Sequence, residues 1–162
     1  TLPDSQGKPY SLTSLLEQGP VIISFFRGGW CPYCVLELKA LRDIMNDLPT
    51  LNATLIAITP ETQEHIAETV SQNELNFIVV SDQNNQLAKQ CGLVFTVPDE
   101  LLKEYQKLGI DINSNNGQAK AELPIPATYI VDQQGTVRFA FVEEDYISRA
   151  EPSHLVTILK AL

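Results

Sequence analysis

The chain carries two cysteines, Cys31 and Cys34, that are separated by only two residues, and a third, Cys91, far along the sequence. This spacing suits thiol–disulfide chemistry, because the two sulfurs can lie one helical turn apart and form a bond with each other. The alternatives are a zinc site and an inert buried pair. Zinc needs about four ligands, and the chain adds only Cys91, His65 and His154, at no zinc-like spacing. We therefore favour redox chemistry and expect neither a metal nor another cofactor.

The pair lies where a strand is expected to turn into a helix. Residues 21–26, VIISFF, are continuously apolar and rich in β-branched and aromatic side chains, which is typical of a strand buried on both faces. From Val35 onward the apolar residues recur at helical spacing. A cysteine at a helix N-terminus faces unpaired backbone N–H groups and the positive end of the helix dipole, and both favour the thiolate. Cys31 is therefore predicted to be the attacking nucleophile.

Three neighbours are expected to shape the same site. Arg27 would place a positive charge close to Cys31 and favour its thiolate. Cys34, one helical turn further in and less accessible, would attack a sulfenic acid or mixed disulfide formed on Cys31. Trp30 either shapes a substrate groove or packs within the loop that precedes the pair.

Pro126 is a more distant candidate, in the segment ELPIPATYIVD. It precedes a strand that should lie beside residues 21–26. A cis bond before it would leave backbone groups free to hold an extended substrate and would keep metal away from the thiols. The alternative is the ordinary trans form of a proline that leads a strand.

The rest of the chain alternates between strand and helix patterns, which predicts a single α/β domain over residues 1–162 with a mixed central sheet flanked by helices. Residues 94–123 interrupt this alternation, and we interpret them as an inserted helix (98–109) and loop (111–120) beside the site or at an interface. The other expected elements are strands at 53–59 and 76–82, helices at 61–73, 85–93 and 151–162, and a β-hairpin at 127–142.

Charge and cysteine usage limit the partners and the compartment. The 162 residues include 20 acidic and 11 basic side chains, a formal net charge of -9, which argues against nucleic acid and anionic membranes as partners. Three cysteines do not make a disulfide framework and fit a reducing compartment, so we expect a cytoplasmic protein. No signal peptide is visible in the residues given, which begin at Thr1.

Several segments together resemble the alkyl hydroperoxide reductase/thiol-specific antioxidant group, the peroxiredoxin-like branch of the thioredoxin fold. The resemblance covers most of the chain and is carried by TLPDSQGKPYSLTSLL, FFRGGWCPYC, IAITPETQEHIAE, NFIVVSDQNNQLAKQCGL and IPATYIVDQQGTVRF. It implies a thioredoxin-like fold, a redox-active Cys31 at the first central helix and a cis Pro126. It also implies a peroxide substrate, a thioredoxin- or glutaredoxin-type reductant and an association into homodimers.

Two positions depart from that family pattern. Peroxiredoxins usually carry a threonine three residues before the peroxide-reducing cysteine, where this chain has Gly28. They also carry an arginine at the start of a late strand, where this chain has Pro126. The motif CPYC itself resembles a glutaredoxin site.

Three functions follow from these observations. The first is a thiol peroxidase, in which a Cys31 sulfenic acid is resolved by Cys34 and a thioredoxin-type reductant restores the dithiol. The second is a disulfide reductase that uses the same pair. The third is a non-catalytic redox sensor or binding module. We favour the peroxidase because the resemblance covers nearly the whole chain.

Overall fold

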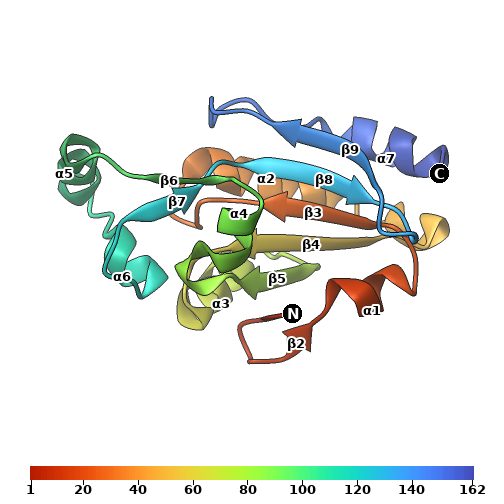
Figure 1. Cartoon of the computed structure of the whole chain (residues 1–162), viewed down its shortest axis with the longest axis horizontal. Coiled ribbons are helices and arrows are strands. Elements are labelled where there is room, and N and C mark those ends of the chain that lie inside the picture. The colour runs from red at the N-terminus through yellow and green to blue at the C-terminus, as the bar shows by residue number, and fades with distance from the viewer.

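The computed structural model describes residues 1–162 and is built around a five-stranded mixed sheet (Figure 1). β3, β4 and β5 run parallel, β8 lies antiparallel to β3, and β9 lies antiparallel to β8. This arrangement confirms the predicted mixed sheet and the predicted hairpin at 127–142. In spatial order the strands are β5 (Ile78–Ser81), β4 (Thr54–Thr59), β3 (Val21–Phe25), β8 (Ala127–Val131) and β9 (Val137–Val142).

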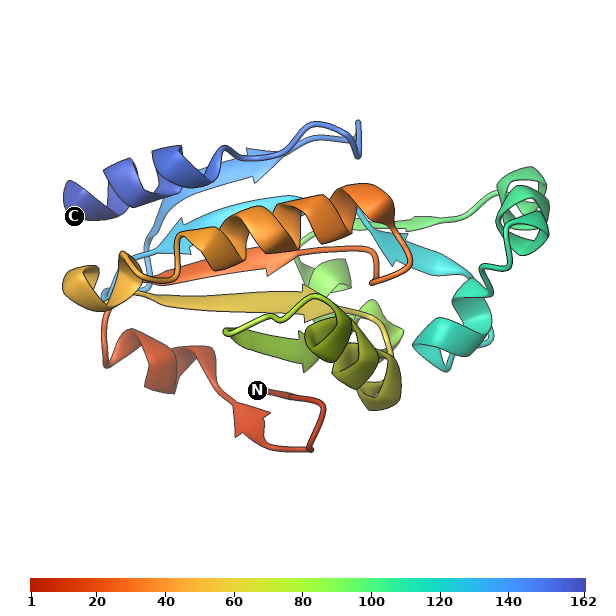
Figure 2. The same ribbon diagram turned by 180° about the vertical axis from the view of Figure 1, so that it is seen from behind.

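Helices cover both faces of this sheet. Seen from behind, α2, α3 and α7 lie in front of the strands, and α4 lies on the far side (Figure 2). No helix combines the length and hydrophobicity that a membrane span requires. The helices around the sheet are α1 (Leu12–Leu16), α2 (Pro32–Asp43), α3 (Gln63–Gln72), α4 (Gln86–Gln90) and α7 (Pro152–Lys160), and the shorter elements are a two-stranded sheet of β1 (Leu2–Pro3) and β2 (Pro9–Tyr10) and 3-10 turns at Leu48–Leu51 and Gln83–Asn85.

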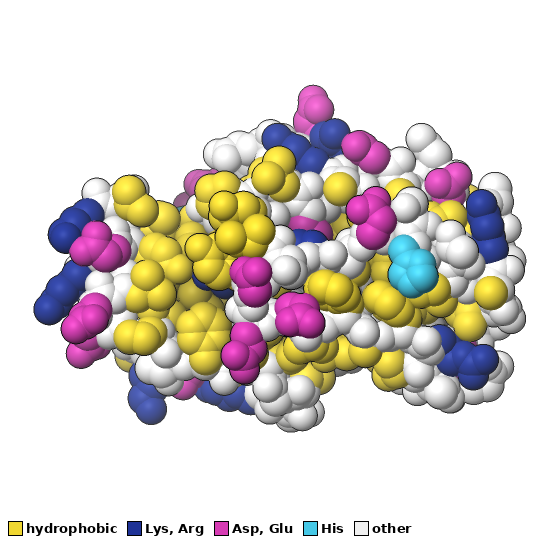
Figure 3. Space-filling model, turned by 90° about the horizontal axis from the view of Figure 1, so that it is seen from above, with side chains coloured by type: hydrophobic (Ala, Val, Ile, Leu, Met, Phe, Trp, Pro, Cys, Tyr) yellow, Lys and Arg dark blue, Asp and Glu magenta, His cyan; other side chains and the backbone are white.

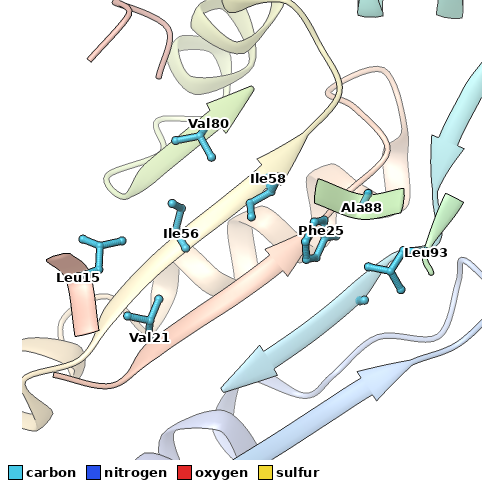
Figure 4. Close-up of a cluster of buried hydrophobic side chains, with 9 residues drawn as sticks. Leu15, Val21, Phe25, Ile56, Ile58, Val80, Ala88 and Leu93 are labelled. Carbon is cyan, nitrogen blue, oxygen red and sulfur yellow. The ribbon is translucent and has the colours of Figure 1, made fainter. Parts of the chain in front are cut away.

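The alternation of side chains along β3 supplies both halves of the core. Val21 and Phe25 point to the face that carries α1 and α4, where they pack with Ile56 and Ile58 of β4 (Figure 4). Ile22 points to the opposite face and joins a cluster with residues of α2 and α7. Successive residues of a strand face opposite sides, so an uninterrupted apolar strand is what a sheet covered on both faces requires. Burial of each large side chain contributes about 1.5–3 kcal/mol.

The segment 94–123 lies at one end of the sheet, on the left in Figure 1. It contains β6 (Val94–Thr96), α5 (Asp99–Lys107), α6 (Ile112–Asn116) and β7 (Glu122–Pro124), and β6 pairs with β7 as a separate two-stranded sheet. The helix predicted at 98–109 is present as α5. A small cluster of its own, with Val97, Ile112, Ala121 and Leu123 at the centre, holds the segment together.

The loop prediction for residues 111–120 was wrong, because α6 lies within it. Asp111 caps this helix, with its Oδ1 accepting a hydrogen bond from the Ser114 backbone N–H at 3.0 Å. Gly117 ends it in the left-handed conformation, with φ 59°. The asparagine-rich composition hid the helix, since its stability comes from the cap and from the buried Ile112 rather than from intrinsic propensity.

Candidate active site

Cys31 lies at the junction between β3 and α2, as the sequence predicts. It is the N-cap residue of α2, with φ -90° and ψ 114°, and Pro32 opens the helix. Pro32 costs nothing there, because the N–H it lacks would have no partner in the first turn. Leu38 and Leu41 are buried beneath α2 and fix the helix against the sheet. Cys31 therefore has a rigid position at the positive end of the helix.

Both cysteines of the pair are free thiols with 0 % exposure. They belong to one buried cluster with Phe26, Leu38 and residues of α3 and β5. Neither sulfur is open to solvent in this arrangement. A reagent must therefore be small or must displace side chains to reach them.

Arg27 lies directly against Cys31. Its Nη2 donates a hydrogen bond to the Cys31 Sγ at 3.1 Å, and its Nη1 donates to the Tyr105 hydroxyl at 3.3 Å. The guanidinium also lies 4.2 Å from the ring centroid of Tyr146 and 5.3 Å from that of Trp30. Trp30 and Tyr105 pack edge to face, with their centroids 5.3 Å apart. Arg27 is thus buried among aromatic rings, and no carboxylate pairs with it.

The pKa values of the two thiols are shifted in opposite directions. The pKa of Cys31 is lowered to about 5, mainly by a hydrogen bond from Cys34 and then by Arg27, although burial acts in the other direction. The pKa of Cys34 is raised well above its ordinary value by burial and by the neighbouring Cys31 thiolate. At neutral pH the pair is therefore a Cys31 thiolate beside a Cys34 thiol. This difference in acidity is what the predicted division into attacking and resolving cysteine requires.

A second arginine reaches the other sulfur. Arg149, just before α7, directs its Nη2 at the Cys34 Sγ at 3.4 Å. Its Nη1 forms an ion pair with the buried Glu37 of α2. Burial raises the pKa of Glu37, and Arg149 offsets part of that effect. Cys34 thus lies beside a guanidinium whose charge is balanced by a carboxylate.

The loop between β3 and α2 is packed too tightly for the threonine that the resemblance expects. A Cβ on Gly28 would lie 2.3 Å from Trp30 Nε1 and 2.9 Å from Glu61 Oε1, and a Cβ on Gly29 would lie 2.0 Å from Thr69 Oγ1. The Gly29 backbone N–H instead donates to Glu61 Oε2 at 3.0 Å. Burial raises the pKa of Glu61 to about 7. The indole of Trp30 occupies the space that a threonine side chain would need.

Pro126 lies at the same end of the sheet as the cysteines, because Ala127 pairs with Phe25, the last residue of β3. The prediction of a cis bond before it was wrong, since the chain contains no cis peptide bond. The Ile125 backbone N–H donates to the Leu93 carbonyl at 2.6 Å. This bond continues the pairing of the inserted strands, so the chain passes in extended trans form from β7 into β8.

The remaining thiol and the two histidines lie apart from this site. Cys91 ends α4 and is exposed. His65 faces Glu68 within α3 at 3.4 Å, and His154 packs against the ring of Phe139. None of the three contacts the cysteine pair, so the zinc alternative finds no ligands there.

Sequence reasoning missed four side chains that complete the site, which are Glu37, Glu61, Tyr105 and Arg149. Of these, only Glu37 could have been predicted from the sequence, because a residue three positions after Cys34 lies on the same face of the helix. The other three come from segments between 30 and 118 residues from Cys31, and no local pattern marks them.

Exposed apolar side chains lie on the helix that carries the cysteines and on the segment before α7. Tyr33 and Leu36 of α2 and Tyr146 and Ile147 before α7 are all exposed, and Tyr33 packs edge to face on Tyr146. We call these four residues the rim. Figure 3 shows that hydrophobic side chains gather at the end of this face where α5 lies, and that acidic side chains are scattered across its middle.

Comparison with known proteins identifies a sequence family that covers most of the chain. The family model described as "AhpC/TSA family" matches residues 1–140. Peroxiredoxin Q from Sedum lineare is 26% identical over 141 residues, which are 87% of this chain and 63% of that protein. The chain spans 59–63% of the length of the curated relatives it matches.

Two solved structures show the same fold. Peroxidoxin BcpB from Mycobacterium tuberculosis is 20% identical with a TM-score of 0.77, over 99% of this chain and 91% of that one. A secreted disulfide oxidoreductase from the same organism is 19% identical with a TM-score of 0.67, over 100% and 95%. The predicted α/β thioredoxin-like fold is confirmed. Because one fold serves both proteins, the chemistry must be argued from the site.

Proposed function

The chain belongs to the AhpC/TSA family, and on that premise we propose that it is a thiol peroxidase that reduces hydrogen peroxide or organic hydroperoxides. The Cys31 thiolate attacks one peroxide oxygen, the O–O bond breaks, and Cys31 becomes a sulfenic acid while water or an alcohol leaves. Cys34 then condenses with the sulfenic acid to form a disulfide. A thioredoxin-type reductant returns the pair to the dithiol.

The observation that carries this proposal is the setting of Cys31. Its sulfur is at a helix N-terminus, accepts a hydrogen bond from Arg27 at 3.1 Å and has a pKa of about 5. It is therefore almost fully ionised at neutral pH, and the thiolate is the reactive form. Arg27 supplies the positive charge next to the sulfur that the family places elsewhere.

Tyr105 is proposed as the second group that acts on the peroxide. Its hydroxyl oxygen accepts a hydrogen bond from Arg27, so its own proton is free to donate to a peroxide oxygen beside Cys31. Donors fixed before the reaction stabilise the charge that develops as the O–O bond breaks. Tyr105 belongs to α5, which gives the segment 94–123 a role as a wall of the site.

The disulfide reductase remains a second candidate, favoured by the CPYC pair and by the absence of the threonine and arginine at positions 28 and 126. The burial of both sulfurs favours a peroxide as the oxidant, because a peroxide needs far less access than a protein disulfide. The reductant must displace side chains to reach the sulfurs. The rim is proposed as the surface that the reductant contacts when it reaches the Cys31–Cys34 disulfide. The homodimer and the cytoplasmic location stay predictions.

Rapid mixing of the reduced protein with hydrogen peroxide and with an alkyl hydroperoxide tests this function. We expect Cys31 to be oxidised far faster than free cysteine, and the Cys31→Ser variant to lose about 10³-fold or more of the peroxide reduction. The Cys91→Ser variant is the matched control and should keep the wild-type rate. A Cys31 that reacts no faster than free cysteine, together with rapid reduction of a glutathione mixed disulfide, would establish the reductase instead.

A further inference from the structure

Arg149 makes three contacts that fix its guanidinium in one place. Its Nε donates to the Tyr146 carbonyl oxygen at 2.9 Å, its Nη1 pairs with Glu37, and its Nη2 points at the Cys34 Sγ at 3.4 Å. Only 12 % of its side chain is exposed. Arg149 is 115 positions from Cys34 in the chain, so the fold rather than local sequence brings this charge to the resolving sulfur.

Glu37 forms an ion pair with Arg149 and fixes the position of the guanidinium next to Cys34. It follows Cys34 by one helical turn, which places both side chains on the same face of α2. Its side chain is 4 % exposed, and its Oε1 accepts a hydrogen bond from the Thr128 hydroxyl of β8 at 3.4 Å. A planar guanidinium that meets a carboxylate keeps a defined orientation. The carboxylate therefore acts on Cys34 indirectly, by orienting the arginine.

The charges around Cys34 change when Cys31 is oxidised. The groups that face the Cys34 sulfur are the Cys31 thiolate, the Arg149 guanidinium and, through that guanidinium, the Glu37 carboxylate. In the dithiol the Cys31 thiolate raises the pKa of Cys34 and Arg149 lowers it. A sulfenic acid at Cys31 is neutral, so the opposing negative charge disappears while the guanidinium stays. The balance then shifts toward a Cys34 thiolate.

We propose that Arg149 is a catalytic residue of the resolving step, which stabilises the Cys34 thiolate once Cys31 has become a sulfenic acid, and that Glu37 is its positioning residue. This proposal rests on the peroxidase function proposed above. The Cys34 sulfur attacks the Cys31 sulfur, an S–S bond forms and the S–O bond breaks. The leaving hydroxide combines with the proton given up by Cys34 and departs as water. The Cys34 sulfur is oxidised as the sulfenic sulfur is reduced, so no further oxidant is needed.

The two steps can be measured separately in the Arg149→Met variant. Oxidation of Cys31 is followed by trapping the sulfenic acid with dimedone, and the disulfide by the loss of free thiols. We expect the sulfenic acid to accumulate and the disulfide-forming step to slow by roughly 10- to 100-fold, because one charge-assisted hydrogen bond is lost. Arg149→Lys should recover part of that rate. Arg138→Met is the matched control, since Arg138 is half exposed and pairs only with Asp132 at 3.5 Å.

The pH dependence distinguishes this role from a structural one. In the wild type, the disulfide-forming step should reach its full rate at a lower pH than in Arg149→Met, whereas a merely loosened helix would lower the rate equally at all pH values. The Glu37→Gln variant keeps the Arg149 charge but loses the carboxylate that orients it, so its disulfide-forming rate should fall by less than in Arg149→Met; it replaces Arg149→Met if that variant does not fold. Equal disulfide-forming rates and midpoints in the wild type and the variants would overturn the proposal. A Cys31 that peroxide does not oxidise would instead overturn the peroxidase function.

Discussion

Each of the two sulfurs has its own arginine, yet the two surroundings produce opposite acidities. Arg27 beside Cys31 has aromatic neighbours and no carboxylate partner. Arg149 beside Cys34 is paired with Glu37. The pKa of Cys31 is lowered to about 5, while that of Cys34 is raised. Proximity of an arginine is therefore not sufficient to activate a cysteine, because burial and the neighbouring Cys31 thiolate outweigh Arg149 at Cys34.

The comparison extends to two buried carboxylates. Glu37 on the Cys34 side has an arginine, a threonine hydroxyl and a fixed orientation. Glu61 on the Cys31 side has only the Gly29 N–H, and burial raises its pKa to about 7. The Cys31 side of the site thus combines an arginine without a carboxylate partner and a carboxyl group that is about half protonated at neutral pH.

Removal of the charge on Arg27 should reduce the difference in pKa between Cys31 and Cys34. Of the changes considered, it is expected to have the largest effect. Arg27→Met should raise the pKa of Cys31 and slow its reaction with peroxide at pH 7 by roughly 10- to 100-fold. The ultraviolet absorbance of the thiolate measures the pKa, and rapid mixing measures the rate. The wild-type rate should fall as the pH drops through about 5, and the midpoint of the variant should lie higher.

Arg138→Met serves as the control for the loss of a surface charge, and it should leave the pKa of Cys31 unchanged. An Arg27→Met protein with the wild-type midpoint would show that the helix terminus and Cys34 suffice to ionise Cys31. That result would contradict the role assigned to the unpaired arginine.

The Gly28→Thr variant tests whether the packing of Trp30 against position 28 requires a glycine there. A Cβ at position 28 would lie 2.3 Å from Trp30 Nε1, so we expect the free energy of unfolding to fall by about 1–3 kcal/mol. Thermal and urea unfolding measure this change. The double variant Gly28→Thr/Trp30→Ala removes the clash with the indole, although not the contact with Glu61, and should be less destabilised than the sum of the two single variants. Strict additivity would mean that the indole is not the obstacle.

The Glu61→Gln variant tests whether Glu61 makes the free energy of unfolding depend on pH. The pKa of Glu61 is higher in the folded protein (about 7) than its ordinary 4.5, so folding favours the protonated form. The free-energy cost of burying the charged form is absent below pH 4.5. It grows as the pH rises and reaches its full value above about pH 7. Relative to Glu61→Gln, the wild type should lose on the order of 1–3 kcal/mol across this range.

Unfolding in urea at several pH values measures this difference, and a Glu144→Gln variant, at an exposed residue without an ion pair, is the control. Parallel pH profiles for the wild type and Glu61→Gln would contradict the raised pKa. The effect on peroxide reduction should be smaller than that of Arg27→Met, because Glu61 contacts the loop backbone rather than the sulfur.

The parts that sequence reasoning predicted correctly are those that local patterns specify. Residues 21–26 are uniformly apolar because both faces of β3 are covered, and Pro32 after Cys31 is a helix-start signal that the structure confirms. The helix at 112–116 and the trans form before Pro126 were missed. A cap and one buried isoleucine stabilise the helix, and pairing between distant strands continues up to Ile125.

By itself the sequence placed two cysteines and Arg27 at a strand-to-helix junction and predicted which sulfur attacks and which resolves, because all of these features lie within eight consecutive residues. Only the tertiary structure decided what surrounds them. Tyr105, Tyr146 and Arg149 come from segments more than 70 residues away, and Glu37 takes on a role only when Arg149 reaches it. The physical reason is that acidity inside a protein depends on all nearby charges and on burial. A local motif specifies the sulfur, and the packing of distant segments specifies its neighbours.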